Sequence, residues 1–212
     1  MITSTASPTA RSNAARVRAC TTPTGALLSW DNEGRLTAWQ NIENVTTSPA
    51  SIPALEEALY DGEGQRIQQL DESDGTNTAT QHTCVGAIED LASQWPNAGG
   101  APTTTTTAYY GGGLAESVNG TLSYTLGDSL GSVSASISTS GVVTATQLYG
   151  PYGSVCYASG TLPTDYAFTH QRADAMSGLD YYNARYYDPV AGQFTSADTT
   201  LAGGLNRGLY LA

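Results

Sequence analysis

Alternating apolar and polar residues, interrupted by turn-forming residues, dominate the chain. The alternation is clearest at residues 122–126 (Leu-Ser-Tyr-Thr-Leu) and 133–137 (Val-Ser-Ala-Ser-Ile). A period of two is typical of β-strands that bury one face. A Thr-Ser-Gly turn at residues 139–141 separates the second run from a return strand at 142–149. Because such hairpins recur along the chain, we expect an all-β fold of antiparallel hairpins.

A turn signature occurs twice, thirty residues apart. Trp30 precedes Asp-Asn-Glu-Gly at residues 31–34, and Tyr60 precedes Asp-Gly-Glu-Gly at residues 61–64. Asp favours the start of a tight turn, and Gly accepts the left-handed backbone at its end. Residues 54–59 have helical propensity, but the shared signature predicts that they end as a strand. Repetition of one hairpin unit points to a repeat architecture.

The remaining segments are less regular. Residues 1–26 are polar, and we expect a disordered tail there. Residues 71–80 have the composition of a turn, 81–88 are a candidate strand, and 96–102 form a predicted loop. Five Thr at the start of residues 103–110 could be a low-complexity run, but two Tyr at its end favour a strand.

Composition gives two opposing signals about folding. Leu, Ile, Val and Phe together make up 35 of the 212 residues, and a share below about 20% with high net charge is typical of disorder. Against this stand 13 Tyr, 3 Trp and 29 Thr, which bring large buried areas and strand preference. Twelve of the Tyr follow residue 100, so we expect the core in the C-terminal half.

The net charge of −11 excludes some functions. All eight basic residues are Arg, too few to neutralise a phosphate backbone, so nucleic-acid binding is not expected. The sequence has no polybasic run for an anionic membrane and no apolar run of about 20 residues. The polar N-terminus does not resemble a secretory signal.

The sequence offers no cofactor or metal site. Cys20, Cys84 and Cys156 are an odd number without C-x-x-C spacing, which predicts neither a zinc site nor a disulfide framework. The glycines at 111–113 lack the Lys of a phosphate loop. The sequence contains no G-x-S-x-G elbow of a serine hydrolase. We therefore expect no cofactor.

Six segments in the C-terminal part resemble the motifs of the Rhs (YD-repeat) family, in the family's order. They are residues 128–133 (D-S-L-G-S-V), 148–153 (L-Y-G-P-Y-G), 168–172 (F-T-H-Q-R), 178–182 (G-L-D-Y-Y), 184–189 (A-R-Y-Y-D-P) and 192–198 (G-Q-F-T-S-A-D). The two earlier hairpin signatures look like the YD repeats themselves. The resemblance covers about residues 25–206 and is strong over 121–206.

The resemblance implies a domain plan. Residues 27–120 are expected to form YD-repeat-like hairpins and residues 121–206 the Rhs repeat-associated core, followed by a divergent, truncated end at 207–212. In this family the hairpins wind into a hollow shell that the core segment closes. Toxin-complex subunits, bacterial polymorphic toxins and animal teneurins share this shell, often around a C-terminal toxin. A chain of 212 residues would be an incomplete shell, and we expect it to be secreted or at a cell surface as part of a larger protein.

Self-cleavage in this family resembles aspartic proteolysis, which needs two carboxylates that share a proton. The resemblance transfers the family's Arg to Arg185 and its first acid to Asp198. The family's second acid lies beyond Ala212, the last residue of this sequence. We therefore expect no enzyme, only a remnant of the site. His170 stands where the family usually has Gly, and we expect a surface-loop role for it.

Three other functions stay open from the sequence. Rows of Tyr could stack on carbohydrate, which would make the chain a surface-binding module. The chain could also be a self-cleaving aspartic enzyme, with the incomplete site just described. Finally, it could be a gene fragment without a function. The leading interpretation is a structural shell segment whose partners are further YD repeats and an enclosed effector.

Overall fold

The structure, a computed structural model, describes residues 18–21, 26–41, 54–72, 79–85, 89–95 and 101–197. These residues form two sheets, one of thirteen strands and one of four, and strands adjacent in sequence are adjacent in each sheet. Every strand pairing is antiparallel, so each sheet is a continuous meander. The predicted all-β fold is confirmed. In the described part of the chain, the one helical element is the short 3-10 turn η1 (Phe168–His170).

The first thirteen strands form the larger sheet and the last four form the small sheet. The larger sheet contains β1 (Arg18–Thr21), β2 (Ala26–Trp30), β3 (Leu36–Asn41), β4 (Leu55–Tyr60), β5 (Arg66–Glu72), β6 (Ala79–Val85), β7 (Glu89–Trp95), β8 (Thr103–Tyr110), β9 (Ala115–Val118), β10 (Thr121–Gly127), β11 (Val133–Ser138), β12 (Val143–Tyr149) and β13 (Val155–Ser159). The small sheet contains β14 (Arg172–Asp174), β15 (Leu179–Tyr182), β16 (Arg185–Asp188) and β17 (Gln193–Phe194).

Most predicted strands are confirmed, with shifted ends. The segment 54–59 forms β4 despite its helical propensity, and the Thr run forms β8. Residues 71–72 and 79–80, part of the predicted turn at 71–80, lie instead in strands, because β5 continues to Glu72 and β6 starts at Ala79. β1 is a strand inside residues 1–26, where the sequence predicts a tail.

One five-residue turn recurs in five hairpins, at residues 31–35, 61–65, 128–132, 138–142 and 150–154. In each, the first residue's N–H donates to the fifth residue's carbonyl, and the fourth residue's N–H donates to the first residue's carbonyl. The fourth residue is always Gly, with φ between 81° and 94°. A register shift in the preceding strand accompanies every copy, as in hairpins that end in a glycine bulge.

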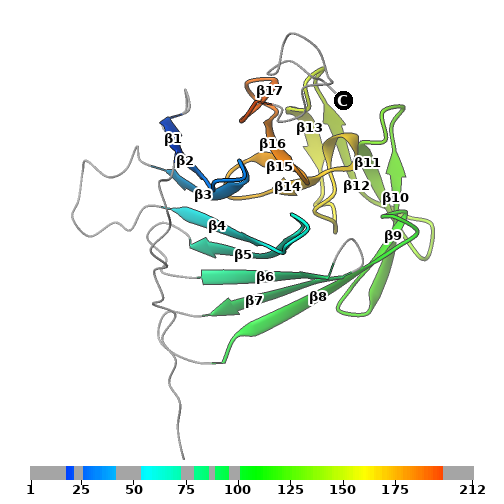
Figure 1. The fold of residues 1–212 in the computed structure, drawn as a ribbon. Coiled ribbons are helices and arrows are strands. Elements are labelled where there is room, and N and C mark those ends of the chain that lie inside the picture. The colour runs from blue at the N-terminus through cyan, green and yellow to red at the C-terminus, as the bar shows by residue number, and fades with distance from the viewer. Residues whose placement is uncertain are drawn as a thin grey trace, which may run out of the picture.

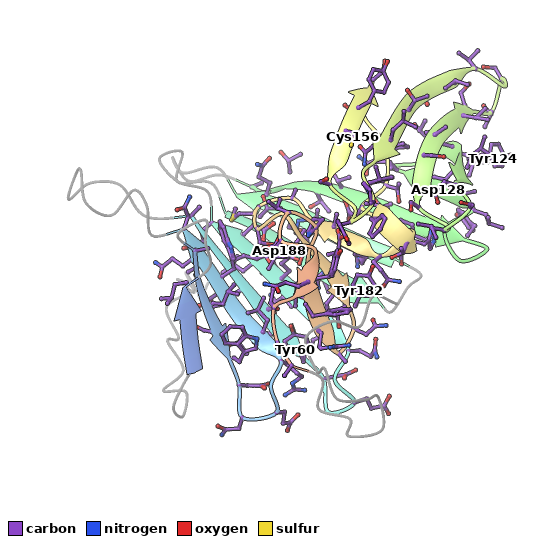
Figure 2. The ribbon with its side chains drawn as sticks, turned by 90° about the horizontal axis from the view of Figure 1, so that it is seen from above. Tyr60, Tyr124, Asp128, Cys156, Tyr182 and Asp188 are labelled. Carbon is purple, nitrogen blue, oxygen red and sulfur yellow. The ribbon has the colours of Figure 1, made fainter. Side chains whose placement is uncertain are left out.

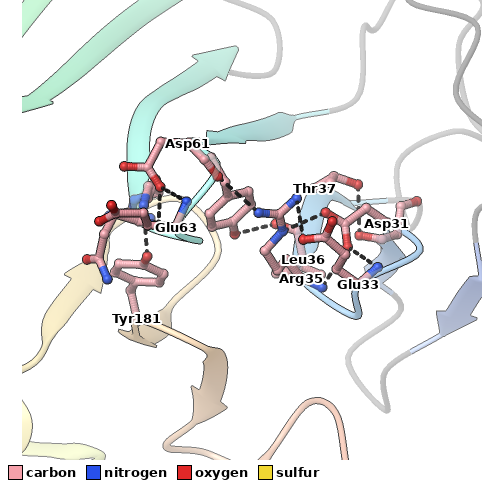
Figure 3. A network of polar contacts seen from close by, with 12 residues as sticks. Asp31, Glu33, Arg35, Leu36, Thr37, Asp61, Glu63 and Tyr181 are labelled. Atoms are coloured by element: carbon pink, nitrogen blue, oxygen red, sulfur yellow. Dashed lines mark hydrogen bonds and ion pairs between the residues drawn. The ribbon is translucent and has the colours of Figure 1, made fainter. Parts of the chain in front are cut away.

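Asp fixes three of these turns through its side chain. In the first copy, Oδ1 of Asp31 accepts the N–H groups of Glu33 and Arg35, each at 2.9 Å. Asp61 and Asp128 accept the equivalent N–H groups at 2.8–2.9 Å. The first two copies lie side by side, because an Nη of Arg35 donates to the Asp61 carbonyl at 3.2 Å (Figure 3).

The small sheet lies between the first and the last strands of the larger sheet, which bends around it (Figure 1). On one side an apolar cluster joins the two sheets. It contains Leu28, Trp30 and Leu36 from the β2–β3 hairpin and Leu179, Tyr181 and Tyr186 from the small sheet. On the other side Phe168 lies 5.9 Å from the Tyr149 ring and 6.3 Å from the Tyr187 ring. Aromatic packing therefore holds the small sheet on both faces.

Candidate functional site

Arg66 is the centre of a buried polar cluster between β5 and the small sheet. It begins β5, directly after the second turn, and only 6% of the residue is exposed. Its Nη1 lies 2.5 Å from Oδ2 of Asp174 and 2.9 Å from the hydroxyl of Tyr186. These contacts join residues more than a hundred positions apart, so the cluster depends on the tertiary fold.

Two tyrosine rings flank the same guanidinium. The Arg66 guanidinium carbon lies 4.4 Å from the centre of the Tyr181 ring and 6.0 Å from that of Tyr186. The Tyr181 hydroxyl also accepts the backbone N–H of Arg66 at 3.0 Å (Figure 3). Cation–π contacts are strongest where water is excluded, as it is here.

Two further carboxyl groups lie in the same cluster. Glu56, on β4, is 2% exposed and stands directly opposite Asp71 of β5 in the sheet register. Burial, followed by the charges of Asp174 and Asp71, raises the pKa of Glu56 well above its ordinary value. Burial also raises the pKa of Asp71, against a hydrogen bond from Gln69 that lowers it.

A small cavity of about 50 Å³ lies beside the cluster. Its lining includes Arg66, Gln69, Asp71, His82 and Asp174. Nε2 of His82 is 3.7 Å from Oδ2 of Asp71. A polar space of this size can hold a water molecule. In the part of the chain that the structure describes, no three His, Cys, Asp or Glu residues are arranged to bind a metal.

The opposite face of the small sheet carries another buried acid. Asp180 is 3% exposed, and its Oδ2 has no hydrogen-bond partner among the described residues. Burial, with smaller contributions from Asp174 and Asp188, raises its pKa to about 7. Glu116, on β9, is likewise fully buried, and burial raises its pKa to about 7. The interior therefore contains several acids that favour the neutral form.

The structure places one of the two predicted catalytic residues. Arg185 begins β16, and its guanidinium carbon lies 3.9 Å from the centre of the Phe194 ring. Asp198 lies outside the described residues, so the pair stays a prediction. Because Arg185 and Tyr186 are neighbours on one strand, they point to opposite faces of the small sheet. Arg185 therefore lies on the face away from the Arg66 cluster.

His170 contacts a neighbouring hairpin. It has φ of 61°, the left-handed conformation that a Gly would adopt without strain. Its ring stacks on Tyr166 at 4.7 Å, and Nε2 lies 2.6 Å from the Gly112 carbonyl. A Cβ at Gly113, whose φ is also positive, would overlap the His170 ring. The histidine thus fits a specific gap at the turn between β8 and β9.

Sequence reasoning missed the Arg66 cluster. Glu56 and Arg66 belong to the second repeat, whereas Asp174 belongs to the core segment, and no local pattern links them. Only the structure shows that Glu56 and Ala58 are buried along β4 while Glu57 and Leu59 are exposed. A charged residue on the apolar face of a strand indicates a buried polar contact.

The fold is similar to those of solved structures with little sequence identity. No protein-family model matches the chain, and no curated protein matches it. The crystal structure of TcdB2-TccC3-Cdc42 matches 89% of this chain with a TM-score of 0.79 and 20% identity. The crystal structure of TcdB2-TccC3 matches 89% with a TM-score of 0.77 and 22% identity. This chain spans about 10% of the length of those chains.

The likeness establishes the fold of this chain. It extends over 89% of the chain. No helix among the described residues has the length and apolar character needed to span a bilayer.

Proposed function

We propose that this chain is a structural segment of an Rhs-type YD-repeat shell and helps to enclose a C-terminal effector. The observation that carries the proposal is the small sheet, which contains the motifs at 178–182 and 184–189. It is packed inside the bend of a sheet made of repeated hairpins. The similarity in fold to the crystal structures of TcdB2-TccC3 supports the proposal.

The proposed partners are further YD repeats and the effector. Among the described residues, β1 pairs only with β2 and β13 only with β12, so both edges can accept another strand. The neighbouring structures are about ten times longer than this chain, which fits a segment of a longer shell. We infer a secreted or cell-surface location for that larger protein.

The proposed role is structural, without catalysis by this chain. Arg185, the predicted catalytic residue that the structure describes, packs on Phe194. Carbohydrate stacking has less support, because eight of the tyrosines already form ring contacts inside the protein. They are Tyr60, Tyr109, Tyr149, Tyr166, Tyr181, Tyr182, Tyr186 and Tyr187.

Purification of the native protein from its source tests this proposal. Antibodies raised against this chain should capture a polypeptide several times heavier than 22.0 kDa, and electron microscopy should show a hollow particle. Mild protease treatment should leave an enclosed C-terminal region intact until the particle is denatured. Capture of a species of 22.0 kDa alone, or of a larger protein without an internal space, would contradict the shell role.

A further inference from the structure

The interface between the small sheet and β4–β5 buries more negative than positive charge. Around Glu56, Asp71 and Asp174 contribute two further carboxyl groups against the one guanidinium of Arg66. A second guanidinium beside the same cavity, that of Arg172, pairs with a fourth carboxyl group, Asp165, at 3.3 Å. Arg66 is already paired with Asp174 at 2.5 Å and bonded to Tyr186. If all three acids were ionised, the interface would hold uncompensated negative charge in a poorly solvated place, which is unfavourable.

Glu56 is the carboxyl group least able to hold a charge. It is 2% exposed, and its Oε2 has no hydrogen-bond partner among the described residues. Asp71 is less buried and has Gln69 as a hydrogen-bond donor at 2.8 Å. Asp174 has the guanidinium. A proton in this cluster therefore binds best at Glu56, whose charge has the least compensation of the three.

The groups around Glu56 come from the neighbouring strands β3 and β5 and from the small sheet. Trp39 of β3 and Asp71 of β5 are its partners across the sheet. From the small sheet, Asp174 faces it with a like charge, and the hydroxyl of Ser177 bonds to its side chain. Four further groups lie nearby: the guanidinium of Arg66, the phenols of Tyr60 and Tyr186, and the imidazole of His82, which faces Asp71.

We propose that a proton bound at Glu56 latches the small sheet onto β4 and β5, so that docking is tight in acid and loosens as the pH rises. When the proton passes to solvent, the new carboxylate faces Asp71 on its own sheet and Asp174 on the small sheet. Separation of the two sheets relieves the second repulsion and lets water reach Glu56. The latch is a property of the fold and does not depend on the shell role.

The direction follows from linkage. Burial and like charges raise the pKa of Glu56 in the docked state, so the docked state binds the proton more tightly than the open state. Its contribution to docking is fully present below the ordinary Glu value of about 4.5 and is lost as the pH rises through the raised pKa. Tyr60 and Tyr186 stay neutral throughout, because burial raises the pKa of both phenols.

Hydrogen exchange on the full 212-residue chain tests the latch. Protection factors, which correct for the intrinsic pH dependence of exchange, are compared at about pH 5 and about pH 8 for the peptides that contain β14–β16. We expect them to fall at least about tenfold at the higher pH in the wild-type chain. Because Asp180 of β15 also has a pKa raised to about 7, the comparison is made in an Asp180→Asn background. There Glu56→Gln, which imitates the protonated side chain, should keep the high protection at both pH values.

Two variants serve as controls. Glu57→Gln changes the exposed neighbour on the same strand and should retain the wild-type pH dependence. His82→Gln should retain it as well, because His82 reaches Asp71 rather than Glu56. Equal protection of the wild-type small sheet at both pH values would overturn the proposal. So would a pH dependence that His82→Gln removes and Glu56→Gln keeps.

A measurement on the wild-type chain tests the proposal even if Glu56→Gln does not fold. Carbon-13 NMR of the glutamate carboxyls in the wild-type chain should show a signal that stays in the protonated position at a pH where the exposed glutamates have already ionised. Because Glu116 also has a raised pKa, the spectrum is repeated with Glu116→Gln, and one protonated signal should persist. Its disappearance in Glu116→Gln would show that Glu56 is ionised and would overturn the latch.

Discussion

Arg66 and Asp174 form an ion pair that is nearly inaccessible to solvent, with side chains 3% and 4% exposed. Removal of one member of such a pair leaves the other charge buried, at a cost of about 3–5 kcal/mol. We therefore expect Arg66→Met to lower the free energy of unfolding by about that amount at neutral pH, measured by urea denaturation. The double variant Arg66→Met/Asp174→Leu should regain most of the loss. If the double variant is as unstable as Arg66→Met, packing of Arg66 on the tyrosine rings, rather than its charge, is the main contribution.

The five-residue turn sets the geometry of the hairpins. Substitution of Gly64 tests whether the turn requires a left-handed residue. A Cβ at Gly64 would meet nothing within 4 Å, but the residue has φ of 85°. The cost of Gly64→Ala is therefore a backbone cost, about 1–2 kcal/mol for a left-handed residue. Gly62, two positions earlier, has equal space and no positive φ, so Gly62→Ala should change stability by less than about 0.5 kcal/mol. Thermal unfolding of both variants makes the comparison, and equal losses would mean that the left-handed residue is not what the turn requires.

The same turn shows how far sequence could predict these elements. The copies at 31–34 and 61–64 were visible because Asp and Gly at fixed positions determine the local backbone. The copy at 128–132 lacks the preceding aromatic and the Glu, and the last two begin with Ser138 and Gly150 instead of Asp. The backbone hydrogen bonds that all five copies share identify them as the same turn. The all-β fold was predictable from such local rules.

The polar cluster was not predictable in this way. Arg66 and Asp174 are 108 residues apart, and their pairing depends on how the small sheet packs into the bend. The segment that contains Glu56 favours a helix by composition, and only the burial of alternate residues along β4 shows where the carboxyl points. Local preference determines strands and turns, whereas long-range packing determines which charges meet.

For the whole molecule, β13 is the feature that connects fold to assembly. It contains no charged residue, and Val155 and Tyr157 are each 54% exposed. Tyr157 lies opposite Leu148 of β12, which is 57% exposed, and Figure 2 shows Cys156 on this strand, away from the small sheet. An open edge beside exposed apolar side chains favours pairing with another strand.

We therefore expect the isolated chain to self-associate through β13 at micromolar concentration. Tyr157→Lys places a charge on this edge, and it should shift the chain toward the monomer in sedimentation velocity runs. The runs contain reductant, because Cys156 is an exposed free cysteine that could otherwise form disulfide-linked dimers. Val190→Lys is the matched control, since Val190 is 78% exposed but lies in the turn between β16 and β17. Association that is equal in all three chains would exclude the β13 edge as the contact. Loss of association in Tyr157→Lys alone would mean that β13 can receive a further strand, as a longer sheet requires.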